Sequence, residues 1–154
     1  MTDKPKHTVY HSTVLDADPD TVWAVVRDIV AVVELVFGDA VQDVGWTARG
    51  SVDKVPSRFD FTLLPNHDLA REEVVGRNEV ERSLTYRSVA QVLSIYDYVA
   101  TYRVLPVTTD PTRSFIEWSR EFRVTDDAAP DFVDGLLAMI GNEIEAVRAH
   151  FAKS

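Results

Sequence analysis

Arg120 is the residue whose chemistry fits its predicted position least. In the segment 114–124, period-two alternation places it on one face with three apolar residues, Ile116, Trp118 and Phe122. In one interpretation, Arg120 extends past the small Ala100 on the neighbouring strand until its charged head reaches water. In the other, the guanidinium projects into a cavity and holds a carboxylate, phenolate or carbonyl group. The sequence leaves both interpretations open.

Glu73 and Tyr86 are the next candidates for chemistry. Antiparallel pairing across the turn at Asn78 brings Glu73 near Tyr86, and pairing across the preceding turn brings Arg58 near Glu73. On the inner face of a sheet, these three side chains would form the polar floor of a pocket. On the outer face, Arg58 and Glu73 would form a partly exposed cross-strand ion pair.

The inward face of the segment 57–64 decides between these two arrangements. Alternation favours Phe59 and Phe61 on the inside, which puts Arg58 outside. A β-bulge or a register shift of one residue reverses that assignment. The inward face of this strand therefore stays open.

Common motifs of nucleotide, hydrolase and zinc sites are absent from the sequence. We find no GxGxxG, GxxxxGK[ST], GxSxG or HExxH pattern. The chain has no cysteine, which excludes thiol nucleophiles, thiolate ligands and disulfides, and its four histidines are scattered. We therefore predict no metal site and no cofactor.

Length and composition indicate one soluble domain over residues 1–154. The chain is 45% hydrophobic and 27% charged, and its formal net charge of -9 disfavours a nucleic-acid partner. No signal peptide is recognisable, and no apolar stretch approaches the roughly 18 residues of a membrane span. Together with the missing cysteines, this predicts a cytoplasmic protein without membrane insertion.

The order of elements that must position these residues is strand, helices, strands, helix. Residues 7–15 predict the first strand. Asp18 and Pro19 then begin a helical segment that extends over 21–37, breaks near Asp28 into two short helices and ends at Gly38. Alternation and turn residues predict six further strands at 40–46, 56–64, 69–76, 83–89, 94–105 and 114–124. Their short connections join only antiparallel neighbours.

The last segment, 130–151, predicts one long amphipathic helix. In the strand 94–105, one face carries Tyr96, Tyr98, Ala100, Tyr102 and Val104. Pairing about the turn at Asp110 puts Tyr102 opposite Trp118, Ala100 opposite Arg120, and Tyr98 opposite Phe122. This apolar face needs a cover, so we predict an α+β fold in which the terminal helix crosses a curved sheet.

Four segments resemble one family: ADPDTVWAVVRD, EEVVGRNEVERSLTYRS, YDYVATYRVLP and TRSFIEWSREF. With their order and spacing, they cover almost the whole chain. On these segments the sequence resembles the START-related helix-grip superfamily (SRPBCC), within it the bacterial polyketide cyclase/dehydrase and lipid transport branch. The resemblance implies a seven-stranded antiparallel sheet that grips a long C-terminal helix, with two short helices after the first strand. It also implies an elongated, mainly apolar cavity between sheet and helix.

The cavity implied by this resemblance is the predicted ligand site. The residues expected to contact a ligand are Phe59, Phe61, Tyr86, Tyr98, Tyr102, Trp118, Arg120, Phe122, Leu136 and Ile140. We expect the ligand to be a small hydrophobic metabolite of aromatic, polyketide-like or lipid-like character. Monomer and homodimer are both compatible with the sequence.

Two alternatives to simple binding stay open. One is an enzyme of the aromatase/cyclase or dehydratase kind that uses the same cavity. In it, Tyr86 or Tyr98 would polarise a carbonyl, Arg120 would stabilise an enolate, and Glu73 would move a proton. The other is an interaction module without a ligand, in which the aromatic side chains pack solid.

Overall fold

A computed structural model describes residues 5–152, so both ends of the predicted domain 1–154 lie outside the described part. The helices are α1 (Pro19–Val26), α2 (Ile29–Phe37) and α3 (Phe132–His150), with a short 3-10 turn, η1 (Gly38–Ala40). The strands are β1 (His7–Leu15), β2 (Val41–Thr47), β3 (Ser57–Leu63), β4 (Asp68–Asn78), β5 (Ser83–Ser88), β6 (Ile95–Pro106) and β7 (Ser114–Val124). The predicted order is confirmed, with boundaries that agree to within one or two residues.

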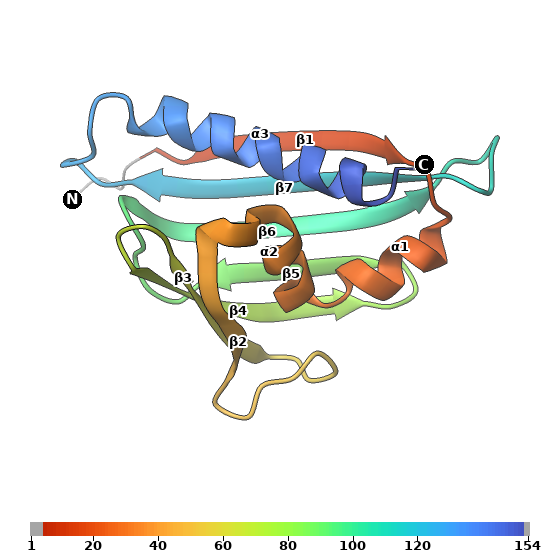
Figure 1. Cartoon of the computed structure of the whole chain (residues 1–154), viewed down its shortest axis with the longest axis horizontal. Coiled ribbons are helices and arrows are strands. Elements are labelled where there is room, and N and C mark those ends of the chain that lie inside the picture. Colours follow the sequence, from red (N-terminus) through yellow and green to blue (C-terminus); the bar gives the residue numbers. More distant parts are fainter. Residues whose placement is uncertain (1–4, 153–154) are drawn as a thin grey trace.

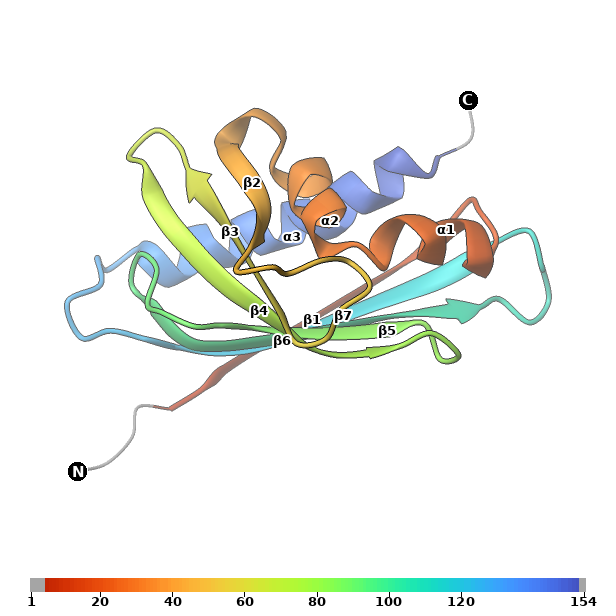
Figure 2. The same cartoon turned by 90° about the horizontal axis from the view of Figure 1, so that it is seen from below.

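The seven strands form one antiparallel sheet in the order β1-β7-β6-β5-β4-β3-β2. The sheet is curved, and α3 runs along its β1 and β7 side (Figure 1). Seen from below, all three helices lie on the same, concave face (Figure 2). This arrangement confirms the predicted helix-grip fold. Among the described residues, no helix is long and apolar enough to cross a lipid bilayer.

Two aspartate caps separate α1 from α2. Asp18 accepts a hydrogen bond from the backbone N–H of Thr21, and Asp28 accepts one from that of Val30 at 3.0 Å. Asp28 therefore breaks the segment, as predicted. The second helix ends at Gly38, whose φ of 53° is in the left-handed region that favours glycine. Because α2 consists largely of β-branched residues with low helix propensity, its burial against the sheet must stabilise it.

The pairing of β6 with β7 sets the face that α3 covers. Tyr102 lies opposite Trp118 and Ala100 opposite Arg120, as predicted. The predicted pairing of Tyr98 with Phe122 is not found, because the register shifts between Tyr96 and Val99. The two rings nevertheless stack, with their centroids 6.3 Å apart.

The register shift in β6 also corrects the predicted position of Tyr96. Beyond it, Ile95 pairs with Val124 and is buried, whereas Tyr96 pairs with Arg123 and turns to the other face. A β-bulge adds a residue to one strand and reverses the side-chain alternation beyond it. Asp97, with a φ of 53°, lies in this bulge.

The inward face of β3, open from the sequence, contains Phe59 and Phe61, both buried. The β3–β4 pairing is regular and puts Arg58 opposite Glu73 on the outer face. In β4, a register shift between Val74 and Gly76 places Tyr86 opposite Val74 and Arg87 opposite Glu73. The expected approach of Glu73 to Tyr86 is therefore wrong.

Replacing Tyr102 by Phe is expected to destabilise the fold. Its hydroxyl donates a hydrogen bond to the carbonyl of Val26, in the last turn of α1, and both residues are buried. The unpaired carbonyl should lower the free energy of unfolding by about 1–2 kcal/mol. Urea denaturation measures this loss. Tyr10→Phe is the control, because Tyr10 is exposed and bonds to Glu117 at the surface; an equal loss there would contradict the assignment.

Candidate functional site

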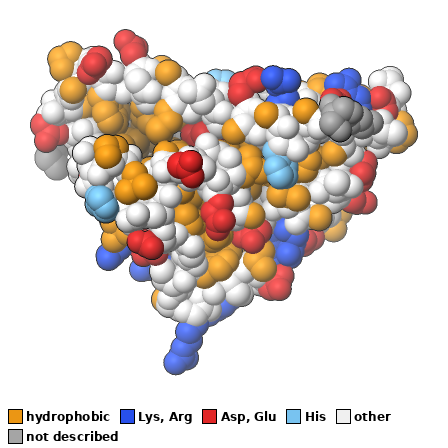
Figure 3. Space-filling view, viewed as in Figure 1, with side chains coloured by type: hydrophobic (Ala, Val, Ile, Leu, Met, Phe, Trp, Pro, Cys, Tyr) orange, Lys and Arg blue, Asp and Glu red, His pale blue; other side chains and the backbone are white. Residues whose placement is uncertain are grey.

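A cavity lies between the concave face of the sheet and helices α2 and α3. It holds about 80 Å³ of free space. Its walls are mostly apolar and include Val33, Val36, Phe37, Phe61, Ala70, Ile95, Trp118, Leu136 and Ile140. In the space-filling view, a hollow lined with hydrophobic side chains opens beside the N-terminal half of α3 (Figure 3). Two of the cavity's lining residues, Leu93 and Met139, are exposed to solvent.

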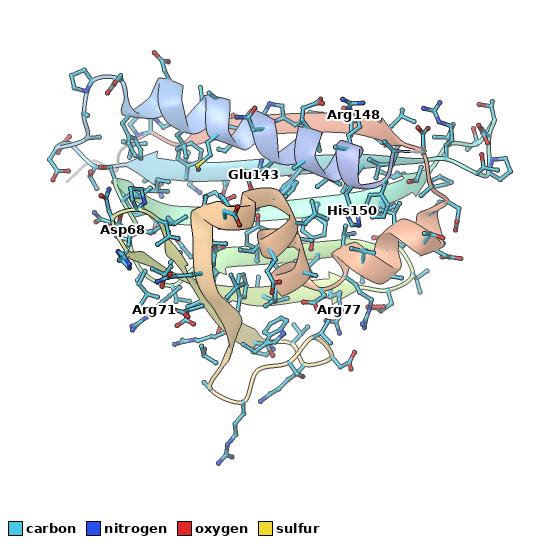
Figure 4. The ribbon with its side chains drawn as sticks, viewed as in Figure 1. Asp68, Arg71, Arg77, Glu143, Arg148 and His150 are labelled. Carbon is cyan, nitrogen blue, oxygen red and sulfur yellow. The ribbon has the colours of Figure 1, made fainter. Side chains whose placement is uncertain are left out.

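The ionisable groups in the cavity wall come from four different elements. Glu72 lies on β4, Tyr86 on β5, Tyr98 on β6 and Glu143 on α3. Glu143 extends from α3 on the side that faces the sheet, whereas Arg148 on the same helix points away from it (Figure 4). These groups are far apart in the sequence, and the curvature of the sheet brings them together.

Arg120 is buried behind this wall and is not one of its lining residues. Only 2% of it is exposed, so its head does not reach water. Its Nε donates to the hydroxyl of Tyr98 at 2.8 Å, and its Nη2 donates to Oε1 of Glu143 at 3.2 Å. The guanidinium lies 4.0 Å from the centre of the Trp118 ring, a cation–π contact. Arg120 thus holds two cavity groups, Tyr98 and Glu143, from behind the wall.

The two tyrosine hydroxyls in the cavity stay protonated at neutral pH. Burial raises the pKa of Tyr98 to about 12, although Arg120 opposes the shift. Burial also raises the pKa of Tyr86 well above its usual value. The two hydroxyl oxygens lie 3.4 Å apart. Because Tyr98 accepts a hydrogen bond from Arg120, its own proton is available to a neighbour or a ligand.

Among the two carboxyl groups in the wall, Glu72 is the one whose ionised form receives less stabilisation. Burial raises its pKa to about 8, Glu143 adds to the shift, and Arg120 opposes it. Its Oε2 atom is buried and has no hydrogen-bond partner among residues 5–152. The carboxyl group is therefore largely neutral at pH 7 and can act as a hydrogen-bond donor.

Glu143 differs from Glu72 because it has a direct cationic partner. Burial raises its pKa, and Arg120 opposes this shift from hydrogen-bonding distance. We therefore assign the negative charge of the site to Glu143, paired with Arg120. Within the described part of the chain, no cluster of three or more His, Cys, Asp or Glu residues could hold a metal ion.

The predicted ligand-contacting residues fall into two groups. Those in the cavity wall are Phe61, Tyr86, Tyr98, Trp118, Leu136 and Ile140. The others support the wall from behind: Phe59 stacks on Phe61, Tyr102 packs edge-on against Trp118, and Phe122 stacks on Tyr98.

Glu73, predicted as a proton carrier, lies on the outer face of the sheet. It forms ion pairs with Arg58 at 3.3 Å and Arg87 at 2.8 Å. The surface ion pair was the correct interpretation, because the parity of β4 turns Ala70, Glu72 and Val74 inward instead. We therefore do not assign Glu73 a role in the cavity.

Glu72 and Glu143 are the site residues that the sequence analysis missed, and both had a signal. Glu72 alternates with Ala70 and Val74, so a strict period of two places it inside. Glu143 lies three residues after Ile140 and four before Val147, which puts it on the apolar face of the helix. Charged residues at buried positions are the informative exceptions to a hydrophobic pattern.

The seven-stranded sheet, the gripped helix and the cavity between them define a helix-grip protein. The chain belongs to the polyketide cyclase / dehydrase and lipid transport family, whose sequence model matches residues 6–153. A search of curated proteins finds no significant match.

Solved structures of similar fold have low sequence identity to this chain. A protein from Nitrosospira multiformis is 22% identical with a TM-score of 0.74, over 96% of this chain and 97% of that one. Truncated norcoclaurine synthase from Thalictrum flavum is 16% identical with a TM-score of 0.73, over 100% and 98%. The aromatase/cyclase Zhui from a Streptomyces species is 15% identical with a TM-score of 0.72, over 95% and 93%. These likenesses show the shared fold.

Replacing Glu72 by Gln is expected to stabilise the protein at alkaline pH. Burial raises the pKa of Glu72 in the folded state from its usual 4.5 to about 8, so the folded state holds the proton over a pH range in which the unfolded state releases it. Wild-type stability should therefore fall relative to the variant between pH 5 and 8, by up to about 1.4 kcal/mol per pH unit. Urea denaturation at several pH values measures the difference.

Glu73→Gln is the matched control for this experiment. Hydrogen bonds and charge from Arg87 and Arg58 lower the pKa of Glu73, so its ionised form stabilises the folded state above the unfolded pKa. This substitution should therefore destabilise the protein at pH 7. If both substitutions changed stability in the same direction, the buried position of Glu72 would be refuted.

Proposed function

We propose that this protein binds a small, mainly apolar molecule, of aromatic or polyketide-like character, in the cavity under α2 and α3. The observation that supports this best is an apolar cavity with a few buried polar groups along one part of its wall. Such sites use apolar surface for affinity and polar groups for orientation. Each buried CH₂ group of a ligand contributes about 0.8 kcal/mol.

The size of the cavity favours a compact ligand. Its free space of about 80 Å³ is below the range of about 300–1,000 Å³ typical of pockets for drug-sized ligands. A single substituted ring therefore suits it better than an extended lipid chain. A related fold supports this size class, since one structure of norcoclaurine synthase, 18% identical with a TM-score of 0.67, is a complex with dopamine and hydroxybenzaldehyde.

The free volume also weighs against an interaction module with a solid core. Two of the aromatic residues that would fill such a core, Phe61 and Trp118, line the free space instead, whereas Phe59 and Tyr102 pack behind them. The free space therefore favours binding or catalysis in the cavity over an interaction module without a ligand.

Filling the cavity should abolish ligand binding. Ala70 is buried in its wall, so Ala70→Leu places three additional carbon atoms into the free space. We expect the affinity for acetophenone and ethylbenzene, measured by ligand-observed NMR titration, to fall at least tenfold. The control is Ala149→Leu, the same change at an exposed position of α3 outside the cavity. Equal affinities in wild type and both folded variants would refute binding in this cavity.

A second candidate function, proton transfer at a carbon next to a carbonyl, is favoured by the buried carboxyl group of Glu72 near the two tyrosine hydroxyls. A hydroxyl such as that of Tyr98 can stabilise a developing enolate while a carboxylate removes the proton. Because Arg120 is bonded to Tyr98, its charge would support the negative charge that forms on the substrate oxygen.

Hydrogen–deuterium exchange tests this catalytic function. If Glu72 is the base, the protein should accelerate exchange of the methyl protons of acetophenone in D₂O. The rate should rise with pH as Glu72, with a pKa of about 8, becomes ionised. Glu72→Gln should abolish the acceleration, and Glu73→Gln should retain it. Binding without any accelerated exchange would leave a binding protein and exclude this reaction.

A further inference from the structure

Two buried polar atoms of the cavity wall lack an internal partner. These are Oε2 of Glu72 and Nε1 of Trp118, neither of which forms a hydrogen bond within the described residues. Buried polar groups in folded proteins are nearly always hydrogen-bonded. Because both side chains line the cavity, we consider a ligand there as the source of the missing partners.

The charges around Glu72 show what kind of ligand is compatible. Glu143 on α3 faces it with a negative charge, and Arg120 on β7 compensates that charge through the 3.2 Å ion pair. Tyr86 on β5 and Tyr98 on β6 are neutral, and the residues of α2 and β3 in the wall are apolar. Arg120, the cation near the cavity, is paired with Glu143 and lies behind the wall; although its Nη1 has no hydrogen-bond partner within residues 5–152, an anionic ligand would compete with Glu143 for its charge.

We infer that Glu72 determines ligand specificity as a neutral hydrogen-bond donor, and that the site selects uncharged ring compounds bearing a carbonyl oxygen while rejecting carboxylates. This inference rests on the proposed function, because it names the ligand class of the same cavity. In the bound state, the protonated carboxyl group of Glu72 donates to the carbonyl oxygen. The indole N–H of Trp118 is a second donor in the same wall.

The stability cost of Glu72 is consistent with this role. An apolar residue at this position would extend the wall formed by Ala70 and Val74 on the same face of β4. A buried carboxyl group next to another carboxylate is instead unfavourable for folding. Titratable groups with strongly shifted pKa values and a specific charge environment are concentrated at functional sites.

The test uses three one-ring probes on the full chain: acetophenone, which carries a neutral carbonyl, benzoate, which is anionic at pH 6.5, and ethylbenzene, which has no oxygen. NMR titration at pH 6.5 should give at least tenfold tighter binding of acetophenone than of benzoate. Between pH 6.5 and 9.5, the affinity for acetophenone should fall at least threefold as Glu72 ionises. The affinity for ethylbenzene should change less than twofold.

Glu72→Gln assigns this pH dependence to one residue. The amide cannot ionise, so the ratio of acetophenone affinities at pH 6.5 and 9.5 should become one. Glu73→Gln, with its substitution on the outer face, should keep the wild-type ratio. If wild type and Glu72→Gln show the same pH profile, or if benzoate binds as tightly as acetophenone, the inference is overturned.

A titration of the wild type alone keeps the test independent of how the variant folds. When acetophenone accepts a hydrogen bond from protonated Glu72, it stabilises the protonated form and must therefore raise the pKa of Glu72. The ¹³C chemical shift of the Glu72 carboxyl carbon, followed against pH, measures this pKa directly. If the titration midpoint of Glu72 is the same with and without saturating acetophenone, the inference is overturned. Binding of ethylbenzene without selectivity among the probes would overturn it but retain the proposed function. No binding of any probe would refute both.

Discussion

The buried guanidinium of Arg120 is the constraint on which the site depends. It stacks on Trp118 of its own strand, bonds to Tyr98 on β6 and pairs with Glu143 on α3. Removing such a charge from water is costly unless all its partners are in place, so a buried pair specifies geometry more than it adds stability. One side chain thereby links two strands and the helix that they grip. The same contacts orient Tyr98 and Glu143 at the cavity wall.

This single cation leaves the polar wall asymmetric. Glu143 has a direct partner in Arg120, whereas Oε2 of Glu72 has none within the described chain. When two buried carboxyl groups lie near one guanidinium, ionising both has a high free-energy cost. Glu143 therefore holds the negative charge, and Glu72 keeps its proton. The cavity therefore combines apolar surface with neutral donors. That combination suits a ligand whose oxygen atoms are uncharged.

Two β-bulges decide which side chains reach this wall. The shift in β6 turns Ile95 inward and Tyr96 outward, and the shift in β4 aligns Tyr86 with Val74. Both irregularities lie in strands that supply polar wall residues. Bulges bend a strand and re-aim its side chains, which is one reason they are frequent near functional sites. They also explain why Glu73, close to Tyr86 by simple counting, points away from it.

The sequence by itself determined the order of the elements and an α+β fold with a covering terminal helix, because alternation, capping residues and turns are local patterns, and its resemblance to the family added the helix-grip architecture. It also determined the two cross-strand pairs around Trp118 and Arg120, since β7 and the adjoining half of β6 are regular. Only the tertiary structure decided that Arg120 supports the wall from behind, and that Glu72 replaces Glu73 as the carboxyl group of the cavity. The reason is physical: a bulge changes parity without a clear local signal, and the partner of a buried charge comes from an element distant in the chain.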